Sequence, residues 1–484
     1  MQDVKSETLR IVGFLCNWCS YGGADTAGVS RFRQPTDLRI IRVPCSGRVD
    51  PLFVARALLS GADGVLVSGC HPRDCHYSDG NFYARRRLEM LKRFLPFLGI
   101  DSRRFHYTWV SASEGQRWQQ TVTQFTKQIH ELGPASKEAE NAAAVALSAT
   151  PAAAGGGAAL TVPSKEQVEA LKKAVIDALS KVDVVVGWKQ GFDPLHVEPC
   201  FIEKPEQAGQ LVFSPLCEQS LAPYLTRLKG KKVGIIVKGC DSRTVVQLLQ
   251  EGLIARDSVY VIGVPCTGTV SVKKAAAAVG GEKVVSVSFE GDAVKVTTAS
   301  GEKRIPLADI LRDKCEPCRY PAPLVHDVLV GEPAKAPAGE GPSGYDDIAA
   351  IEAMPLAERR AYWERELGRC IRCYGCRNAC PLCVCEESCI AETRDPHWMT
   401  QEVTPAEKKM FHLVHAIHTA GRCTECGECE RACPMGIPLM KLKKKINKDM
   451  LDLFNYVAGT DPDEKPPLYT FKVDEERIEE HKLA

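Results

Sequence analysis

The sequence lacks an excess of charge of either sign. It has 62 Lys and Arg residues against 61 Asp and Glu residues, for a formal net charge of +1. A chain balanced in this way produces no long-range field that would attract nucleic acid or an anionic membrane surface. We therefore expect no nucleic-acid partner.

Long apolar runs are also missing. No stretch reaches the roughly 18–20 apolar residues that a membrane-spanning helix needs. The first ten residues, MQDVKSETLR, lack the basic start and apolar run of a secretory signal. We find no Ser–His–Asp arrangement, P-loop or zinc-protease motif. These absences predict a cytoplasmic protein with no membrane span and without these catalytic sites.

Cysteine, in contrast, is abundant, with 22 residues in 484. Thiols stay reduced in the cytosol, so disulfides are not expected there. Many cysteines in a cytosolic chain indicate metal ligation.

Two low-complexity segments divide the chain. Residues 134–163 and 332–344 are rich in Ala, Gly and Pro, a composition typical of flexible linkers. The remaining length is enough for several domains, each with its own core. We predict domains at 1–133, 164–331 and 345–484, with the longer linker leaving the first domain free to dock separately.

Short β-branched runs alternate with helical patterns in the first two domains, which predicts parallel sheets. The third domain shows little strand signal. The predicted fold class is α/β, with two parallel-sheet α/β domains followed by a mostly helical two-cluster domain. The expected strands are LRIVGFL (9–15), LRIIRV (38–43), GVLVSG (64–69), VDVVVGW (182–188), GQLVFSPL (209–216), KKVGIIVKG (231–239) and SVYVIGVP (258–265).

Two cysteine runs in the third domain share the spacing C-x2-C-x2-C-x3-C-P. In this pattern the fourth cysteine of each run ligates the cluster of the other run. We therefore predict two 4Fe–4S clusters. The ligands of the first are Cys370, Cys373, Cys376 and Cys433, and those of the second are Cys423, Cys426, Cys429 and Cys380.

This arrangement resembles the two-cluster bacterial ferredoxin module over about 365–440. A zinc-stapled scaffold is the alternative. Three further cysteines, Cys383, Cys385 and Cys389, follow the first run and could ligate another centre or be buried thiols.

Cysteines also follow the expected strands of the first domain. Side chains at the carboxyl ends of parallel strands meet in one crevice. Five candidates therefore compete for four ligand positions, namely Cys16, Cys19, Cys45, Cys70 and Cys75. His71 and His76 could act as Rieske-type ligands, but with so many thiols nearby we expect them either to support the site through hydrogen bonds or to lie in a polar surface loop.

The first domain resembles the delta, iron–sulfur subunit of methyl-viologen-reducing hydrogenase. The matching motifs are CNWCSYGGADTAG (16–28), VPCSGR (43–48) and GADGVLVSGCHPRDCHYSDGN (61–81). The resemblance implies a 2Fe–2S cluster that exchanges electrons with a heterodisulfide-reductase-type flavoprotein.

The middle domain repeats the pattern of cysteines after strands. We predict a third 4Fe–4S cluster on Cys240, Cys266, Cys315 and Cys318, with two buried thiols plus an unrelated C-x2-C pair as the alternative. The roles of Cys200 and Cys217 stay open.

KGCDSR (238–243) and IGVPCTG (262–268) are similar to motifs of the beta subunit of deazaflavin-reducing hydrogenases and formate dehydrogenases. That family binds FAD and a 4Fe–4S cluster. The family's Gly-Gly FAD segment is absent, and WKQGFDPLHVEPC (188–200) stands in a similar place. The departure puts FAD in doubt.

Together these patterns predict a non-catalytic electron-transfer subunit with the ferredoxin module at one end of a longer circuit. Its partners would be a heterodisulfide-reductase-like flavoprotein and a hydrogenase, formate dehydrogenase or similar donor. The alternative is an FAD-containing oxidoreductase that exchanges hydride with a deazaflavin or nicotinamide coenzyme through the middle domain.

Overall fold

The computed structural model describes residues 9–144, 160–316, 318–333, 344–385, 387–392, 398–478 and 483. Within this part of the chain, none of the helices is long and apolar enough to cross a bilayer. Parallel sheets in the first two domains and helices in the third confirm the predicted fold class.

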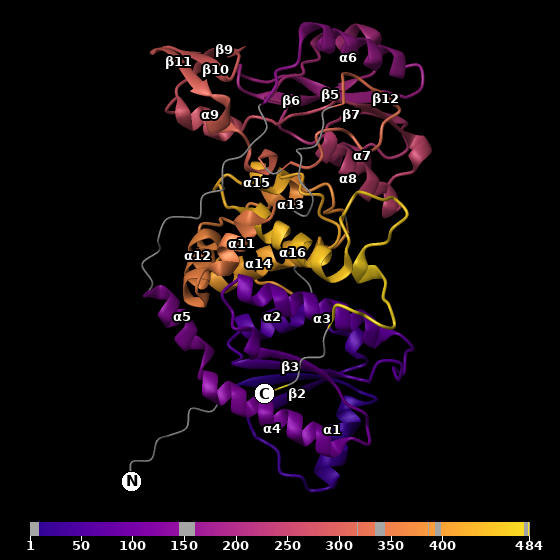
Figure 1. Cartoon of the computed structure of the whole chain (residues 1–484), viewed down its shortest axis with the longest axis vertical. Coiled ribbons are helices and arrows are strands. Elements are labelled where there is room, and N and C mark those ends of the chain that lie inside the picture. The colour runs from indigo at the N-terminus through magenta and orange to yellow at the C-terminus, as the bar shows by residue number, and fades with distance from the viewer. Residues whose placement is uncertain are drawn as a thin grey trace.

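The first domain is a four-stranded parallel sheet of order β2-β1-β3-β4. Helices α2 and α3 cover the face toward the C-terminal domain, and α1 and α4 cover the other (Figure 1). β3 is buried along its whole length, which explains its continuous apolar sequence. The elements are β1 (Ile11–Cys16), α1 (Ser20–Val29), β2 (Leu38–Val43), α2 (Pro51–Leu59), β3 (Gly64–Gly69), α3 (Gly80–Phe97), β4 (Phe105–Trp109) and α4 (Gly115–Leu132).

The middle domain has a five-stranded sheet of order β12-β8-β7-β5-β6, parallel except for β6. A small antiparallel sheet, β11-β10-β9, lies beside it. The elements are α6 (Lys165–Ala178), β5 (Val184–Gln190), β6 (Val197–Ile202), α7 (Pro223–Arg227), β7 (Val233–Val237), α8 (Gly239–Gln250), β8 (Val259–Gly263), α9 (Val272–Ala278), β9 (Val284–Glu290), β10 (Ala293–Thr298), β11 (Gly301–Pro306), α10 (Leu307–Ile310) and β12 (Val328–Leu329).

The strand predicted at 209–216 is wrong. Only Leu211 makes an isolated bridge, to Lys189. Pro215 has no N–H to offer a ladder, and the Cys217 N–H donates to the Ser214 carbonyl in a turn. The chain therefore leaves the sheet at this point.

The C-terminal domain consists of helices around the two cysteine runs. α14 shows how its sequence specifies a helix start: Thr404 accepts a hydrogen bond from the Glu407 N–H, and Pro405 is the first helical residue. The helices are α11 (Asp346–Ala353), α12 (Leu356–Gly368), α13 (Gly375–Ala379), α14 (Pro405–His418), α15 (Glu428–Arg431) and α16 (Leu439–Phe454).

The order of the domains in space differs from their order along the chain. The C-terminal domain lies between the two α/β domains (Figure 1). The ferredoxin module is therefore the middle of the molecule, and the prediction that it forms one end is wrong.

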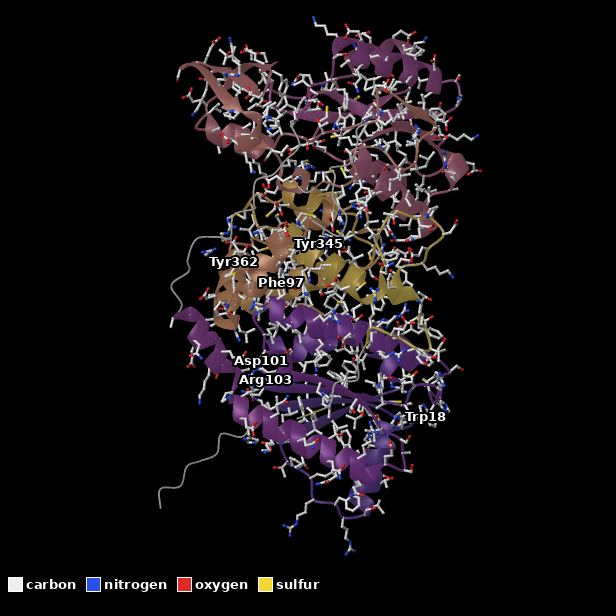
Figure 2. The ribbon with its side chains drawn as sticks, in the orientation of Figure 1. Trp18, Phe97, Asp101, Arg103, Tyr345 and Tyr362 are labelled. Atoms are coloured by element: carbon white, nitrogen blue, oxygen red, sulfur yellow. The ribbon has the colours of Figure 1, made fainter. Side chains whose placement is uncertain are left out.

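One apolar core joins the C-terminal domain to the first domain. Phe97 of α3 packs against Trp363 of α12 with ring centroids 5.4 Å apart, and Figure 2 shows Phe97 and Tyr362 at this boundary. After α16 the chain runs back over α3, where Phe471 stacks on Phe82 at 5.1 Å. The first domain is therefore packed against the rest, which contradicts the expectation that it docks separately.

The first predicted linker begins with a helix, α5 (Ala135–Ala143). Glu138 accepts a hydrogen bond from Arg104 at 2.6 Å and pairs with Arg360 of α12 at 3.3 Å. These ion pairs fix residues whose composition alone suggested flexibility, so the linker prediction is wrong for 135–143. Most of the rest of the two predicted linkers, residues 145–159 and 334–343, lies outside the described residues.

Candidate metal centres

The carboxyl ends of three parallel strands bring the thiols of the first domain together. Cys16 ends β1, and Cys45 and Cys70 lie just beyond β2 and β3. The Sγ atoms of Cys16 and Cys70 are 3.7 Å apart. Those of Cys45 and Cys75 are also 3.7 Å apart. Cys19 lies beside Cys70, so the five cysteines expected in one crevice are neighbours.

Crowding shifts the pKa values of these thiols in opposite directions. The Cys45 and Cys70 thiols hydrogen-bond to the Cys16 sulfur, which lowers the pKa of Cys16. The same contacts, followed by burial, raise the pKa of Cys45 and Cys70. Because thiolate is the metal-binding form of cysteine, this donor set fits an iron–sulfur cluster.

Two facing glycines leave room for these sulfurs. A Cβ on Gly80 would lie 2.6 Å from the Cys45 Sγ, and one on Gly47 would lie 2.7 Å from the Gly80 carbonyl oxygen. The Gly47 N–H points at the Cys45 Sγ, with 3.4 Å between nitrogen and sulfur. We did not single out these glycines from the sequence, although both stand within the motifs that carry the family resemblance.

The two histidines of this region have other partners. His71 Nε2 lies 2.6 Å from the Glu114 Oε2 atom. His76 stacks on Trp18 with ring centroids 3.8 Å apart. Trp18 Nε1 donates to the Tyr77 hydroxyl at 3.2 Å, and both rings are about half exposed. The result is a surface patch of Trp18, His76 and Tyr77, which we call the aromatic patch, beside the thiols.

The two cysteine runs of the C-terminal domain share one backbone conformation. Arg372 (φ 51°) and Tyr374 (φ 60°) of the first run match Glu425 (φ 58°) and Gly427 (φ 73°) of the second in position. Residues other than glycine rarely take positive φ, and such residues concentrate at functional sites. The matched strain indicates that both loops wrap around groups of the same kind.

The fourth cysteine of each run lies with the first three of the other. Burial, together with the charges of Cys370 and Cys433, raises the pKa of Cys376 to about 12. Burial and the charge of Cys380 likewise raise the pKa of the second run's cysteines, Cys423, Cys426 and Cys429. This grouping is the one that crossed ligation requires; the ligand assignment itself stays a prediction.

A third set of thiols lines a cavity of about 340 Å³ between the middle and C-terminal domains. Cys240 lies in the first turn of α8, and Cys266 follows β8. Cys315 and Cys318 close the set, with the Cys315 Sγ 3.6 Å from the Thr269 hydroxyl. The four cysteines predicted as a third set therefore share one cavity.

Two lysines beside the thiols, one partly and one fully buried, are functional candidates that we missed in the sequence. Lys314 Nζ lies 3.5 Å from the Cys240 Sγ and donates to the Cys426 carbonyl at 2.6 Å, so it bridges two thiol sets. Lys443 donates to the Thr419 hydroxyl at 2.6 Å and acts electrostatically on Cys376 and on the second run. The only feature of the sequence that could have pointed to Lys314 is its position directly before Cys315.

Cys200 and Cys217 belong to the apolar core of the middle domain. Burial raises the pKa of each to about 11, which keeps both thiols neutral. They lie outside the three thiol sets.

Three family models match successive stretches of the chain. Residues 11–133 match the methyl-viologen-reducing hydrogenase delta subunit. Residues 230–347 match the C terminus of the coenzyme F420 hydrogenase/dehydrogenase beta subunit. Residues 366–437 match the 4Fe–4S dicluster domain, so iron–sulfur clusters are part of this protein. The families expected from the motifs are confirmed.

Similarity to one curated protein covers the first domain. The vhc iron-sulfur subunit of the F420-non-reducing hydrogenase of Methanococcus voltae is 52% identical over 125 residues, which are 26% of this chain and 87% of that protein. The chain belongs to this family of iron–sulfur subunits. Its similarity to the family ends with the first domain, and the other two domains extend beyond it.

Other relatives match different parts. The beta subunit of the F420-dependent formate dehydrogenase of Methanocaldococcus jannaschii is 26% identical over 373 residues, or 63% of this chain and 94% of that protein. One subunit of the Ferredoxin/F(420)H(2)-dependent CoB-CoM heterodisulfide reductase of Methanosarcina acetivorans is 49% identical over 141 residues, or 29% of this chain. The chain spans only 18% of the length of that reductase protein.

Proposed function

We propose that this chain is an iron–sulfur electron-transfer subunit. It would relay electrons between a donor hydrogenase or dehydrogenase and a heterodisulfide-reductase-like flavoprotein. The observation that carries the proposal is the domain order in space, with the dicluster domain between two α/β domains that each carry a thiol set. Iron–sulfur clusters exchange single electrons without a substrate pocket or a general base.

The proposed cofactors follow the thiol sets. Four of the five N-terminal cysteines would hold a 2Fe–2S cluster, as in the resemblance. The crossed sets of the C-terminal domain would hold two 4Fe–4S clusters, and the cavity set of Cys240, Cys266, Cys315 and Cys318 would hold a third. The domains would be 1–133, 164–331 and 345–484.

The chain's own residues hold these sets at a fixed spacing. Lys314 joins the cavity set to the second cysteine run. Lys273 of α9 donates to the Cys433 carbonyl, which ties the middle domain to the fourth cysteine of the second run. Arg243 of α8 donates to the Ala458 carbonyl at 2.7 Å. These contacts limit the relative movement of the domains, which keeps the thiol sets at a constant separation.

Partner docking is proposed at the aromatic patch. Trp18 and Tyr77 expose large rings next to the N-terminal thiols, and aromatic rings are preferred anchors in protein interfaces. The relatives named as subunits of hydrogenase, formate dehydrogenase and heterodisulfide reductase support oxidoreductase partners. The flavoprotein would bind here.

The test is anaerobic purification of the protein from its native host. Iron, sulfide and flavin analysis, electron paramagnetic resonance during stepwise reduction, and identification of co-purifying subunits come from one sample. We expect iron with sulfide and an oxidoreductase partner. Zinc without sulfide would contradict the proposal and favour a scaffold.

The alternative proposal is an FAD-containing oxidoreductase. The middle domain offers a second cavity of about 460 Å³ beside Cys266, lined by Lys238 and Phe213 among others. Trp188, the first residue of the segment that stands near the place of the family's FAD segment, is fully buried and donates to the Gln219 carbonyl. Flavin released on denaturing the anaerobic protein would favour this alternative.

A further inference from the structure

The cysteines after the first run share a cavity that the thiol sets described above do not use. Cys383, Cys385 and Cys389 line a cavity of about 380 Å³ together with His415 and His418 of α14. They come from a loop whose spacing, C-x-C-x3-C, is independent of the two ferredoxin runs. Three thiols and an imidazole in one cavity are a complete donor set for a thiophilic metal.

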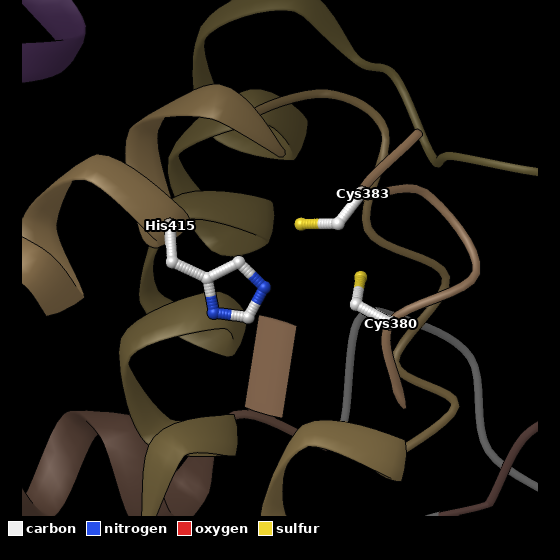
Figure 3. Close-up of side chains that lie close together, drawn as sticks. All are labelled: Cys380, Cys383 and His415. Atoms are coloured by element: carbon white, nitrogen blue, oxygen red, sulfur yellow. The ribbon is translucent and has the colours of Figure 1, made fainter. Parts of the chain in front are cut away.

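His415 points its ring at the sulfurs of Cys383 and of the neighbouring Cys380. A ring nitrogen of His415 and the Sγ atoms of Cys380 and Cys383 lie within 4.8 Å of one another. Figure 3 shows the ring facing the two sulfurs. The residue is only 5% exposed, and its Nε2 atom has no hydrogen-bond partner among the described residues. A buried ring nitrogen left unpaired is costly, and a metal ion would satisfy it.

Positive side chains surround the same cavity. Arg377 donates to the Cys385 carbonyl at 2.9 Å and pairs with Glu392 at 3.2 Å. Arg422, also in the cavity wall, pairs with Glu251 of the middle domain. Cations beside thiols favour the thiolate form and offset the negative charge of thiolate-ligated centres.

The cavity also lies between two thiol sets. Its far wall comes from the first domain, through Asp50, Pro51 and Arg87. Arg87 donates to the Gly47 carbonyl at 3.2 Å, and the Gly47 N–H points at the Cys45 Sγ. On the near side, Cys383 is next to Cys380, the crossed cysteine of the second set. The cavity thus fills the space between the N-terminal set and the ferredoxin module.

We propose that Cys383, Cys385, Cys389 and His415 hold a further iron–sulfur cluster. A structural zinc site closes tightly around one ion, whereas this cavity is roomy, cationic and placed between two redox sets. The site stands on its own residues; only its role as a link between the first domain and the ferredoxin module rests on the proposed function.

The test compares iron and acid-labile sulfide in the full-length, anaerobically purified protein and in a Cys383→Ser/Cys389→Ser variant. The double variant should lose about four iron atoms and about four sulfides per chain. Mössbauer spectra should lose one component while the remaining 4Fe–4S components persist. The matched control, Cys200→Ser/Cys217→Ser, removes two core thiols and should lose no iron.

Two further variants keep the test decisive if the double variant folds poorly. Cys385→Ser changes an exposed side chain and should also deplete the same component. His415→Gln should abolish a nitrogen hyperfine coupling in pulsed paramagnetic resonance of the reduced protein. Unchanged iron in the cysteine variants, or loss of zinc alone, would overturn the proposal. Failure of the proposed function would look different, because the wild-type protein would then keep the iron and sulfide of this site but co-purify with no oxidoreductase partner.

Discussion

The charge of Lys314 should set the reduction potential of the 4Fe–4S cluster that we propose for the cavity set, called the cavity cluster below. Its Nζ lies 3.5 Å from the Cys240 Sγ and its side chain is partly buried; burial lowers its pKa, but the charge of Cys240 raises it further, so the pKa lies above its usual value. The added electron spreads over the irons behind the sulfur, so a charge separation of about 6 Å is realistic. With an effective dielectric constant of about 20, the attraction is about 3 kcal/mol. Because about 1.4 kcal/mol corresponds to about 59 mV for one electron, the Lys314 charge raises the reduction potential by at most about 120 mV.

Lys314→Met removes this attraction and nearly preserves the shape of the side chain. The reduced cluster carries more negative charge, so losing the ammonium should lower the potential, by roughly 50–120 mV. The second ferredoxin cluster should move the same way by less, because Lys314 reaches it through the Cys426 carbonyl. The assay is a redox titration followed by electron paramagnetic resonance.

The control is Lys231→Met, which removes the same charge from an exposed pair with Glu203. Solvent and salt screen this site, so its shift should stay within about 10 mV. Equal iron content in both variants shows that the clusters are intact. A potential that rises in Lys314→Met, or one that moves no more than in the control, would refute the electrostatic reasoning.

Three more predictions test the thiol sets and the core. Gly80→Ala places a Cβ 2.6 Å from the Cys45 Sγ and should deplete the iron of the N-terminal cluster by at least about half. The control, Gly28→Ala, places a Cβ with nothing within 4 Å and should keep its iron. Equal iron in the two variants would count against this cluster site. Cys433→Ser should remove the signal of the Cys370 cluster and Cys380→Ser that of the Cys423 cluster, as seen by paramagnetic resonance; the reverse pattern would disprove crossed ligation. Burial lowers the pKa of His412 from 6.5 to about 3, so the unfolded chain binds this proton first and stability should fall as pH drops below about 6.5. His412→Leu should weaken the dependence of the unfolding temperature on pH between pH 7.5 and 5.5, whereas the exposed His130→Gln should leave it unchanged. An unchanged pH dependence in His412→Leu would exclude His412 as the cause.

Local sequence patterns predicted most elements of this fold. Strands β1, β3 and β7 were evident because each is short, apolar and β-branched. The segment at 209–216 had a similar composition but met a turn at Pro215. Composition also misjudged 135–143, because the ion pairs of Glu138 come from distant parts of the chain.

The candidate sites likewise include residues that local sequence patterns predict and residues that matter only through distant contacts. Spacing along the chain sufficed for the two ferredoxin runs, and position after strands sufficed for the N-terminal thiols. Lys314, Gly80 and His415 were not predictable, since each matters through a contact with an element far away in sequence. The position of the ferredoxin module between the α/β domains depends on apolar faces that no local pattern reveals.

That central position has a consequence for synthesis on the ribosome. The first domain is complete by residue 133, but the helices that cover its apolar face, α14 and α16, end at residues 418 and 454. At about 5–20 residues per second, that face waits roughly 15–60 s for its cover. A nascent chain therefore presents the apolar side chains of α2 and α3 to water, chaperones and other chains during that interval. Premature termination after the middle domain would leave both α/β domains without the layer that joins them.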